Sequence, residues 1–141
     1  MTKPRQSDTI EVRVYYQDTD CGGVVYYGNY LRYFEQGRTQ WLETRGSSVK
    51  AFMDAGILFA VVHAELHYRS PARYGETLTI ATRLTEFRPA SFTFAHEIRE
   101  KRSGRLVVEG SARLVAVDTQ GKLVKLPKDL RGRLAKAIGA A

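Results

Sequence analysis

The chain has 141 residues, one cysteine and a formal net charge of +7 at pH 7. This length suits one domain over residues 1–141, with flexible ends expected at 1–8 and 138–141, and such a domain buries roughly 68% of the surface that its unfolded chain exposes. One cysteine excludes an internal disulfide and a multi-cysteine zinc site, and no segment is typical of a signal peptide or a transmembrane helix. We therefore expect a cytoplasmic protein.

The first part of the chain predicts a strand followed by one long helix. Apolar and polar residues alternate from Thr9 to Tyr16, which indicates a half-buried strand. Helical spacing follows from about Asn29 to Arg45, with Asn29 as the expected N-cap and Gly46 as the stop. Gly37 lies on the apolar side of this helix at a cost of about 1 kcal/mol relative to alanine, which predicts close approach to a sheet. The strand's apolar face holds Ile10, Val12, Val14 and Tyr16.

The rest of the chain predicts a short helix, four strands and a final helix. Val49 to Asp54 has helical spacing and ends before Gly56. Period-two patterns follow at 57–68, 78–84, 92–98 and 106–117, and a last amphipathic helix runs from Pro127 to about Ala137. Pro and Gly turns separate the strands, and the last two connections are short enough for antiparallel hairpins. We expect an α+β fold with a five-stranded sheet curled around the long helix, and unpaired sheet edges that a second copy would cover.

Two carboxylates precede the long helix. In an extended backbone, the side chains of Asp18 and Asp20 point the same way. They either place negative charge at a functional site or simply accept hydrogen bonds from the loop backbone, as aspartate often does in turns. Gly22 and Gly23 let the chain fold back, and Gly28 opens the first turn of the helix to a ligand. The amides at the helix start are then unpaired at the positive end of the helix dipole. A carboxylate facing such donors suits attack on an acyl carbonyl.

The run from Tyr16 to Tyr30 resembles a known family. Its D-T-D, Gly-Gly and Tyr-Gly-Asn-Tyr motifs are similar to those of hotdog-fold acyl-CoA thioesterases of the 4-hydroxybenzoyl-CoA thioesterase type, and most similar to the bacterial members associated with the Tol-Pal system. The likeness in length and element order extends from about Thr9 to Arg133. It implies a hotdog fold, an acyl-CoA substrate, no metal or redox cofactor, and a homotetramer assembled from dimers.

The resemblance also assigns roles to residues of the run. Asp20 matches the catalytic carboxylate, which acts as nucleophile or general base, and Asp18 matches a position that supports the loop. The backbone N–H groups of Tyr27 and Gly28 match the oxyanion site. The sequence departs from the pattern at Tyr27, where many relatives of the Tol-Pal type have histidine, and at Cys21, where a small residue or proline is common.

Binding of the substrate can be assigned less directly. The resemblance and the need of CoA phosphates for cations favour Arg88, in the turn before Ser91, and the hairpin of Lys101, Arg102 and Arg105. For the acyl pocket, core packing is an equal alternative for each aromatic candidate. The substrate-binding residues that we expect are Tyr30, Arg88 and Ser91, with Tyr26 and Phe59 as further pocket candidates.

Three other features allow competing chemistry. Cys21 precedes a helix N-terminus, which lowers a thiol pKa, but no histidine lies close in sequence to act as its base. His63, Glu65 and His67 alternate along a predicted strand and share a face, so a metal site is geometrically possible, although a plain strand face is favoured. His96 shares a strand face with apolar residues, which predicts a core or interface histidine.

The positive charge leaves non-enzymatic functions open. Six basic residues lie between Lys122 and Lys136 and suit a solvated face, the phosphates of CoA or an acidic acyl-carrier protein. Eight tyrosines and the basic composition also suit nucleic acid. The aromatic residues are more simply explained as packing. The sequence therefore favours a thioesterase that does not bind nucleic acid. The alternative is a non-enzymatic protein that binds an acyl-carrier protein or nucleic acid.

Overall fold

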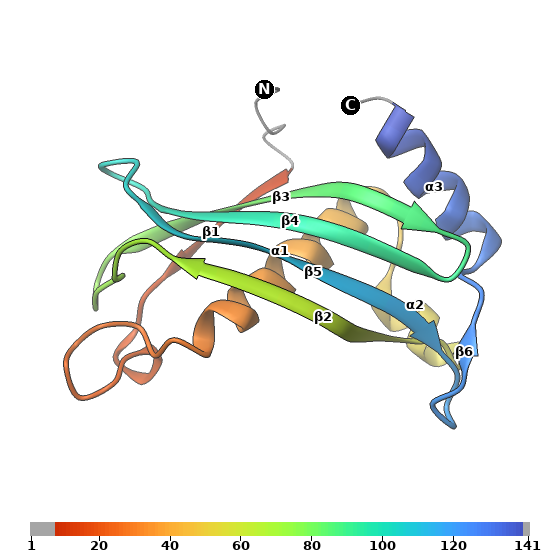
Figure 1. Cartoon of the computed structure of the whole chain (residues 1–141), viewed down its shortest axis with the longest axis horizontal. Coiled ribbons are helices and arrows are strands. Elements are labelled where there is room, and N and C mark those ends of the chain that lie inside the picture. Colours follow the sequence, from red (N-terminus) through yellow and green to blue (C-terminus); the bar gives the residue numbers. More distant parts are fainter. Residues whose placement is uncertain (1–7, 140–141) are drawn as a thin grey trace.

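A computed structural model describes residues 8–139. Residues 1–7 and 140–141, which form most of the ends expected to be flexible, lie outside the described residues. Within the described range, Asp8 forms an ion pair of 2.7 Å with Arg45 and the last helix continues to Gly139. The elements are β1 (Thr9–Arg13), the 3-10 turn η2 (Tyr16–Asp18), α1 (Asn29–Thr44), α2 (Val49–Asp54), β2 (Leu58–Tyr68), β3 (Thr77–Arg88), β4 (Ser91–Glu100), β5 (Leu106–Val117), β6 (Leu123–Val124) and α3 (Lys128–Gly139) (Figure 1). No helix among these is long and apolar enough to cross a bilayer.

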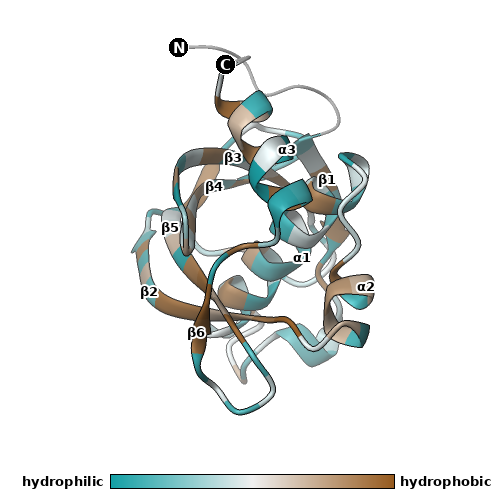
Figure 2. Ribbon diagram, turned by 90° about the vertical axis from the view of Figure 1, so that its right-hand side faces the viewer, coloured by the Kyte–Doolittle hydropathy of each residue, from teal (hydrophilic) through white to brown (hydrophobic). Residues whose placement is uncertain are grey.

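The strands form one antiparallel sheet in the order β1-β3-β4-β5-β2, and β6 pairs with the end of β5. The described sheet thus has six strands rather than the five predicted, because a two-residue strand is too short to show a period of two. The long helix α1 lies in the hollow of the curved sheet, and α3 lies beside β3 (Figures 1 and 2). The α+β arrangement predicted from the sequence is confirmed.

Gly37 is the point at which α1 comes closest to the sheet. A Cβ atom built on Gly37 would lie 2.5 Å from Thr82 Oγ1 and 3.0 Å from Ile80 Cγ2. Any larger residue would push the helix away from β3, so the close approach predicted from this glycine is confirmed.

The sequence-based prediction was wrong at the start of the motif loop. Tyr16 was expected on the buried face of a strand, but β1 ends at Arg13 and the Tyr16 side chain is 80% exposed. The backbone turns at residues 16–18 because Asp18 Oδ2 accepts a hydrogen bond of 2.8 Å from the Tyr15 N–H and closes a 3-10 turn. The N-cap of α1 is likewise Gly28 rather than Asn29, which is the first helical residue.

His96 is a core histidine, as its position on an apolar strand face predicts. Its side chain is 2% exposed, its ring stacks on Phe34 with 4.4 Å between centroids, and its Nδ1 lies 3.0 Å from Thr82 Oγ1. Burial, and then the charge of Arg38, lowers the pKa of His96 from 6.5 to about 3. The imidazole is therefore neutral in the folded protein.

The buried His96 predicts that the protein loses stability in mild acid. The pKa of His96 is lower in the folded state than in the unfolded state. The stability that the neutral His96 contributes is therefore fully present above pH 6.5, and it is lost as the pH falls and the unfolded state binds a proton. Between pH 7 and pH 5 this loss amounts to about 2 kcal/mol in the free energy of unfolding. Urea titrations at both pH values should show that the pH-dependent loss shrinks by this amount in His96→Phe. An unchanged loss in the variant would contradict the assignment to His96.

Candidate active site

The loop between β1 and α1 is held together by Asp18. Besides the Tyr15 N–H, its carboxylate accepts a hydrogen bond from Asn29 Nδ2 at 3.0 Å, and its backbone oxygen accepts one from the Tyr26 N–H at 2.9 Å. Asp18 thus joins the beginning of the loop to the first turn of α1. These contacts are those of a side chain that supports a loop.

Asp20 lies at the tip of the loop with its carboxylate exposed to solvent. Its Oδ1 accepts a hydrogen bond of 2.8 Å from the Gly22 N–H, and its backbone oxygen accepts one of 3.2 Å from the Gly23 N–H. Gly23 has a φ of 76°, a region that glycine adopts at no steric cost. The turn therefore fixes one carboxylate oxygen and leaves Oδ2 without a bonded partner among the described residues.

Two backbone donors are free where α1 begins. The Tyr26 and Asn29 N–H groups have acceptors at 2.9 Å and 2.8 Å, whereas the N–H groups of Tyr27 and Gly28 between them have none within residues 8–139. Gly28 has helical φ and ψ, and an added Cβ would lie 2.8 Å from the Tyr26 ring, so a larger residue requires this 50% exposed side chain to shift. Free amides at the positive end of a 16-residue helix can bind an oxygen that gains negative charge.

A pocket of about 400 Å³ has Tyr27 in its wall, whereas Gly28 does not line it. Tyr30 lies in its wall but is only 3% exposed and belongs to a core cluster, and its hydroxyl accepts a hydrogen bond from the Ala72 N–H at 3.3 Å. Tyr68, at the end of β2, donates a hydrogen bond to the Tyr27 carbonyl oxygen at 3.3 Å. The wall consists of Val25, Tyr27, Tyr30, Tyr68, Arg69, Ser70 and Pro71. Sequence reasoning missed Val25 and the last four, and only the pairing of β2 with β5 brings the end of β2 to the start of α1.

A more polar cavity of about 480 Å³ lies between β1 and α1. Asp18, Asn29 and Arg32 contribute to its lining, and Asp20 lines neither this cavity nor the smaller pocket. We place the candidate site at the smaller pocket because Tyr27, which carries one of the two free amides, lies in its wall.

Arg88 and Ser91 do not join this site within one chain. They face each other across the turn between β3 and β4, where Arg88 Nε pairs with Glu86 Oε1 at 2.7 Å. The other end of β3, at Thr77, lies beside the motif loop, and the twelve residues of β3 separate the two ends by roughly 36 Å. The turn and the motif loop lie at opposite ends of the sheet (Figure 1).

The other predicted contacts differ in how they are engaged. Lys101 pairs with Glu11 at 2.8 Å and Arg105 pairs with Glu76 at 3.1 Å, whereas the Arg102 guanidinium has no partner among the described residues. The Tyr26 ring lies against the Tyr27 ring with 4.7 Å between centroids and does not line the pocket. The Phe59 ring meets Phe92 edge to face at 5.4 Å, so it belongs to the core packing.

The competing chemistry receives no support from the geometry. Cys21 is an exposed free thiol with no histidine bonded to it in the described part of the chain. His63 and Glu65 are exposed on β2 and pair with each other at 3.1 Å. Across residues 8–139, no group of three or more potential ligands is placed to hold a metal ion.

Comparisons with known proteins show the family to which the chain belongs. Residues 14–134 match the model of the thioesterase-like superfamily. The acyl-CoA thioester hydrolase YbgC of Escherichia coli is 37% identical over 120 residues, which cover 84% of this chain and 89% of that protein. The acyl-CoA thioesterase YbgC of Haemophilus influenzae is 33% identical over 123 residues, covering 85% and 88%.

Solved structures show the same architecture. A 1,4-dihydroxy-2-naphthoyl-CoA thioesterase from Synechocystis superimposes with a TM-score of 0.83 at 26% identity, covering 90% of this chain and 94% of that chain. The DHNA-CoA thioesterase from Staphylococcus aureus reaches a TM-score of 0.89 at 24% identity, covering 94% and 91%. These likenesses confirm the hotdog fold, with a short sixth strand added to the expected sheet.

Proposed function

Because the chain belongs to the thioesterase-like superfamily and is a thioester hydrolase, we propose that it cleaves acyl-CoA to a free acid and CoA with Asp20 as the catalytic carboxylate. The observation that carries this proposal is the pair of free N–H groups at Tyr27 and Gly28. They are the oxyanion site in the proposal, and Asp18 supports the loop that presents Asp20.

Two routes for Asp20 fit the exposed carboxylate. In one, Asp20 attacks the thioester carbon, the C–S bond breaks, CoA leaves as thiolate, and water hydrolyses the mixed anhydride. In the other, Asp20 takes a proton from a water molecule that attacks the same carbon. Both place negative charge on the carbonyl oxygen, which the amides of Tyr27 and Gly28 stabilise. A thiol with a pKa of about 8.5 leaves without strong help from a general acid.

The acyl group is proposed to lie in the pocket, against the wall formed by Tyr30 and Tyr68. The rings of these two residues are 5.8 Å apart between centroids, and both come within reach of the start of α1. The thioester carbonyl then points to the free amides, and the CoA moiety extends toward solvent.

The direct test is thiol release from a panel of short-chain, long-chain and aromatic acyl-CoAs. We expect turnover of at least one substrate by the wild type and by Cys21→Ser, whose activity should stay within about threefold because the thiol has no base. Inactive Cys21→Ser would move the nucleophile to residue 21. No thiol release by the wild type would overturn the proposal, and salt-sensitive binding of generic DNA or RNA in its place would favour the nucleic-acid alternative.

We further propose that the protein is a homo-oligomer, with dimers assembling into a tetramer, and that β2 is the edge that pairs between copies. β2 is the edge strand of the sheet beyond β5, and it exposes several large apolar side chains. Exposed apolar edges favour pairing with another chain. The exposed apolar residues of β2 are Leu58, Val61, Val62 and Tyr68.

Val62→Lys should weaken this association. The Val62 side chain is 51% exposed on the edge strand, and a charge placed there would be buried between two copies. We expect a dimer dissociation constant at least about tenfold higher, measured by light scattering over a concentration series, with a parallel loss of activity. Leu123→Lys, at an apolar position on β6 that is 67% exposed, is the control. Equal effects of the two variants would contradict pairing through β2.

Pairing of two copies along β2 also accounts for Arg88 and Ser91 as substrate-binding residues. Antiparallel pairing about a two-fold axis reverses the strand direction, so the turn between β3 and β4 of a second copy lies at the same end as Asp20 of the first. We propose that this turn meets the CoA moiety across the two copies, and that an acyl-carrier protein is a second donor of acyl groups.

The cellular setting is also a proposal. A single free cysteine and a CoA substrate suit a protein of the cytoplasm. The resemblance to the Tol-Pal-associated thioesterases favours an association with the Tol-Pal system. The likeness to the two YbgC proteins is consistent with this association.

A further inference from the structure

We propose that Arg105 is a positioning residue, which holds the segment 69–76 and through it the loop that carries Asp20. The inference rests on the proposed function, because it assigns a role in the reaction at Asp20. It replaces the expectation that Arg105 contacts a CoA phosphate.

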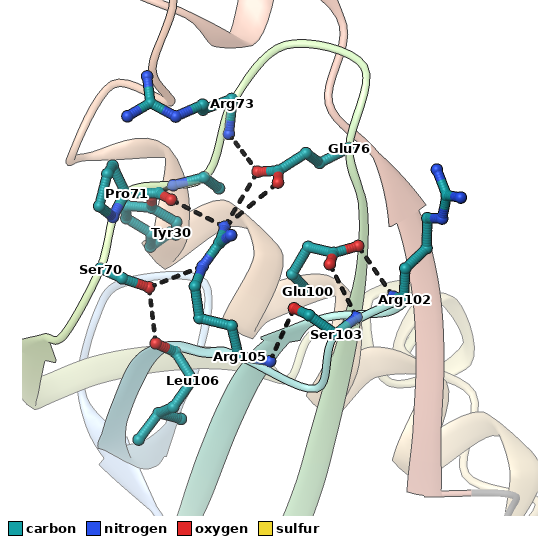
Figure 3. Close-up of polar contacts among 11 residues, drawn as sticks. Tyr30, Ser70, Pro71, Arg73, Glu76, Glu100, Arg102, Ser103, Arg105 and Leu106 are labelled. Carbon is teal, nitrogen blue, oxygen red and sulfur yellow. Dashed lines mark hydrogen bonds and ion pairs between the residues drawn. The ribbon is translucent and has the colours of Figure 1, made fainter.

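The guanidinium of Arg105 binds both ends of the segment 69–76. Its Nε donates to Ser70 Oγ at 3.1 Å, and its Nη2 donates to the Pro71 carbonyl oxygen at 3.0 Å and to Glu76 Oε1 at 3.1 Å (Figure 3). Ser70 Oγ in turn donates to the Leu106 carbonyl oxygen at 2.7 Å. Ser70, to which Arg105 donates, thereby ties the segment to Leu106, the first residue of β5.

The Glu76 carboxylate accepts a hydrogen bond from the backbone as well as from the Arg105 guanidinium. Its Oε1 also accepts a hydrogen bond of 2.7 Å from the Arg73 N–H, so one carboxylate closes the turn 73–76 and pairs with Arg105. The Arg105 side chain is 38% exposed, less than the side chains of most ion pairs in the chain. Nε and Nη2 are thus engaged, and only Nη1 has no partner among the described residues, so the guanidinium can offer an external phosphate Nη1 alone. Arg102 extends away from this cluster in Figure 3 and remains the cation of the hairpin available to a ligand.

The segment 69–76 bonds to the Asp20 loop on both sides of Asp20. Before it, the Val14 N–H donates to the Glu76 carbonyl oxygen at 2.9 Å. After it, the Val25 N–H donates to the Ala72 carbonyl oxygen at 2.8 Å, and the Tyr74 N–H donates to the Gly23 carbonyl oxygen at 3.1 Å.

The same segment reaches the oxyanion end of the site. The Ala72 N–H donates to the hydroxyl of Tyr30, which lies in the first turn of α1. A shift of residues 70–76 would therefore move the carboxylate relative to the amides of Tyr27 and Gly28. Misplacement by about 1 Å can lower a rate about 100-fold.

Steady-state kinetics with two thioesters separates positioning from phosphate binding. One substrate is an acyl-CoA that the wild type hydrolyses, and the other is the same acyl group on pantetheine, which has no phosphate. For Arg105→Gln we expect kcat to fall about tenfold or more on both substrates with KM unchanged within about twofold. Arg105→Lys, which keeps the charge beside Glu76, should recover part of kcat.

Arg99→Gln is the matched control. It removes the same charge from the end of β4, where Arg99 bonds to the Gly104 carbonyl oxygen and Glu97 and does not contact the segment 69–76. Its kcat should stay within about twofold of the wild type. A higher KM for acyl-CoA alone, with kcat unchanged, would restore Arg105 as a phosphate contact and overturn the proposal.

Hydrogen exchange provides a readout that does not depend on turnover. In Arg105→Gln the amides of Val25 and Tyr74 should exchange faster, while the amide of Trp41 in α1 keeps its wild-type rate. Faster exchange at all three amides would mean a general loss of stability and would overturn the positioning role. If Asp20→Asn retains activity, the proposed function fails, whereas the exchange pattern still decides whether Arg105 holds the loop.

Discussion

Asp20→Asn is expected to lower kcat for acyl-CoA hydrolysis by about 1,000-fold. An amide neither attacks a thioester nor takes a proton from water, and removal of such a group typically costs two to four orders of magnitude. The substitution keeps an oxygen that can accept the hydrogen bond from the Gly22 N–H, at 2.8 Å in the wild type, so the turn is retained. Steady-state thiol release, with the melting temperature measured in parallel, gives the comparison.

Asp118→Asn is the matched control for this experiment. Asp118 closes a similar turn far from the site, where its Oδ1 accepts hydrogen bonds from the Gln120 N–H at 2.8 Å and the Lys122 N–H at 3.0 Å. The same change of a turn aspartate should therefore leave kcat unchanged. If Asp20→Asn keeps more than about a tenth of the wild-type kcat, Asp20 is a turn residue and the carboxylate chemistry lies elsewhere.

Gly110→Ala should destabilise the fold by about 3 kcal/mol or more. Gly110 lies in β5, between Leu66 of β2 and His96 of β4. An added Cβ would overlap the backbone carbonyl oxygen of Glu65 and lie 3.1 Å from Phe34 Cε2. A backbone atom cannot rotate away as a side chain can, so the ladder between β2 and β5 must open. Denaturant unfolding at pH 7 measures the loss.

Gly132→Ala provides the opposite expectation for the same substitution. Gly132 is in α3, and a Cβ there would have no atom within 4 Å among the described residues. Alanine in a helix interior is favoured over glycine by about 1 kcal/mol, so this variant should be more stable than the wild type. Equal midpoints for Gly110→Ala and the wild type would show that the sheet adjusts without cost.

The elements with a long, regular pattern could be predicted from the sequence. The helical spacing of 29–45 locates α1 within one residue at its C-terminal end, and Gly37 indicates its contact with the sheet because only close packing explains a glycine there. The prediction failed at Tyr16 because a local bond from Asp18 outweighs an alternating pattern. It missed β6 because a pair of residues has no period.

The candidate site shows the same division. Asp18 and Asp20 are equivalent in the sequence, and only the motif resemblance separated their roles; in the structure they also differ in what they contact. Tyr68 and Ser70 could not be predicted because strand pairing brings them to the start of α1 from far along the chain. The sequence indicates Arg105 only as a cation, because its ion pair with Glu76 depends on a fold that spacing does not specify.

The free amides at the start of α1 have a consequence for how such a site can change. In the proposed mechanism the oxyanion donors belong to the main chain, so replacing the side chain of residue 27 removes neither donor. Tyr27 is 64% exposed and lines the pocket proposed for the acyl group. Position 27 can therefore vary in evolution, or be randomised in the laboratory, to alter substrate choice while the chemistry at the carbonyl is inherited unchanged.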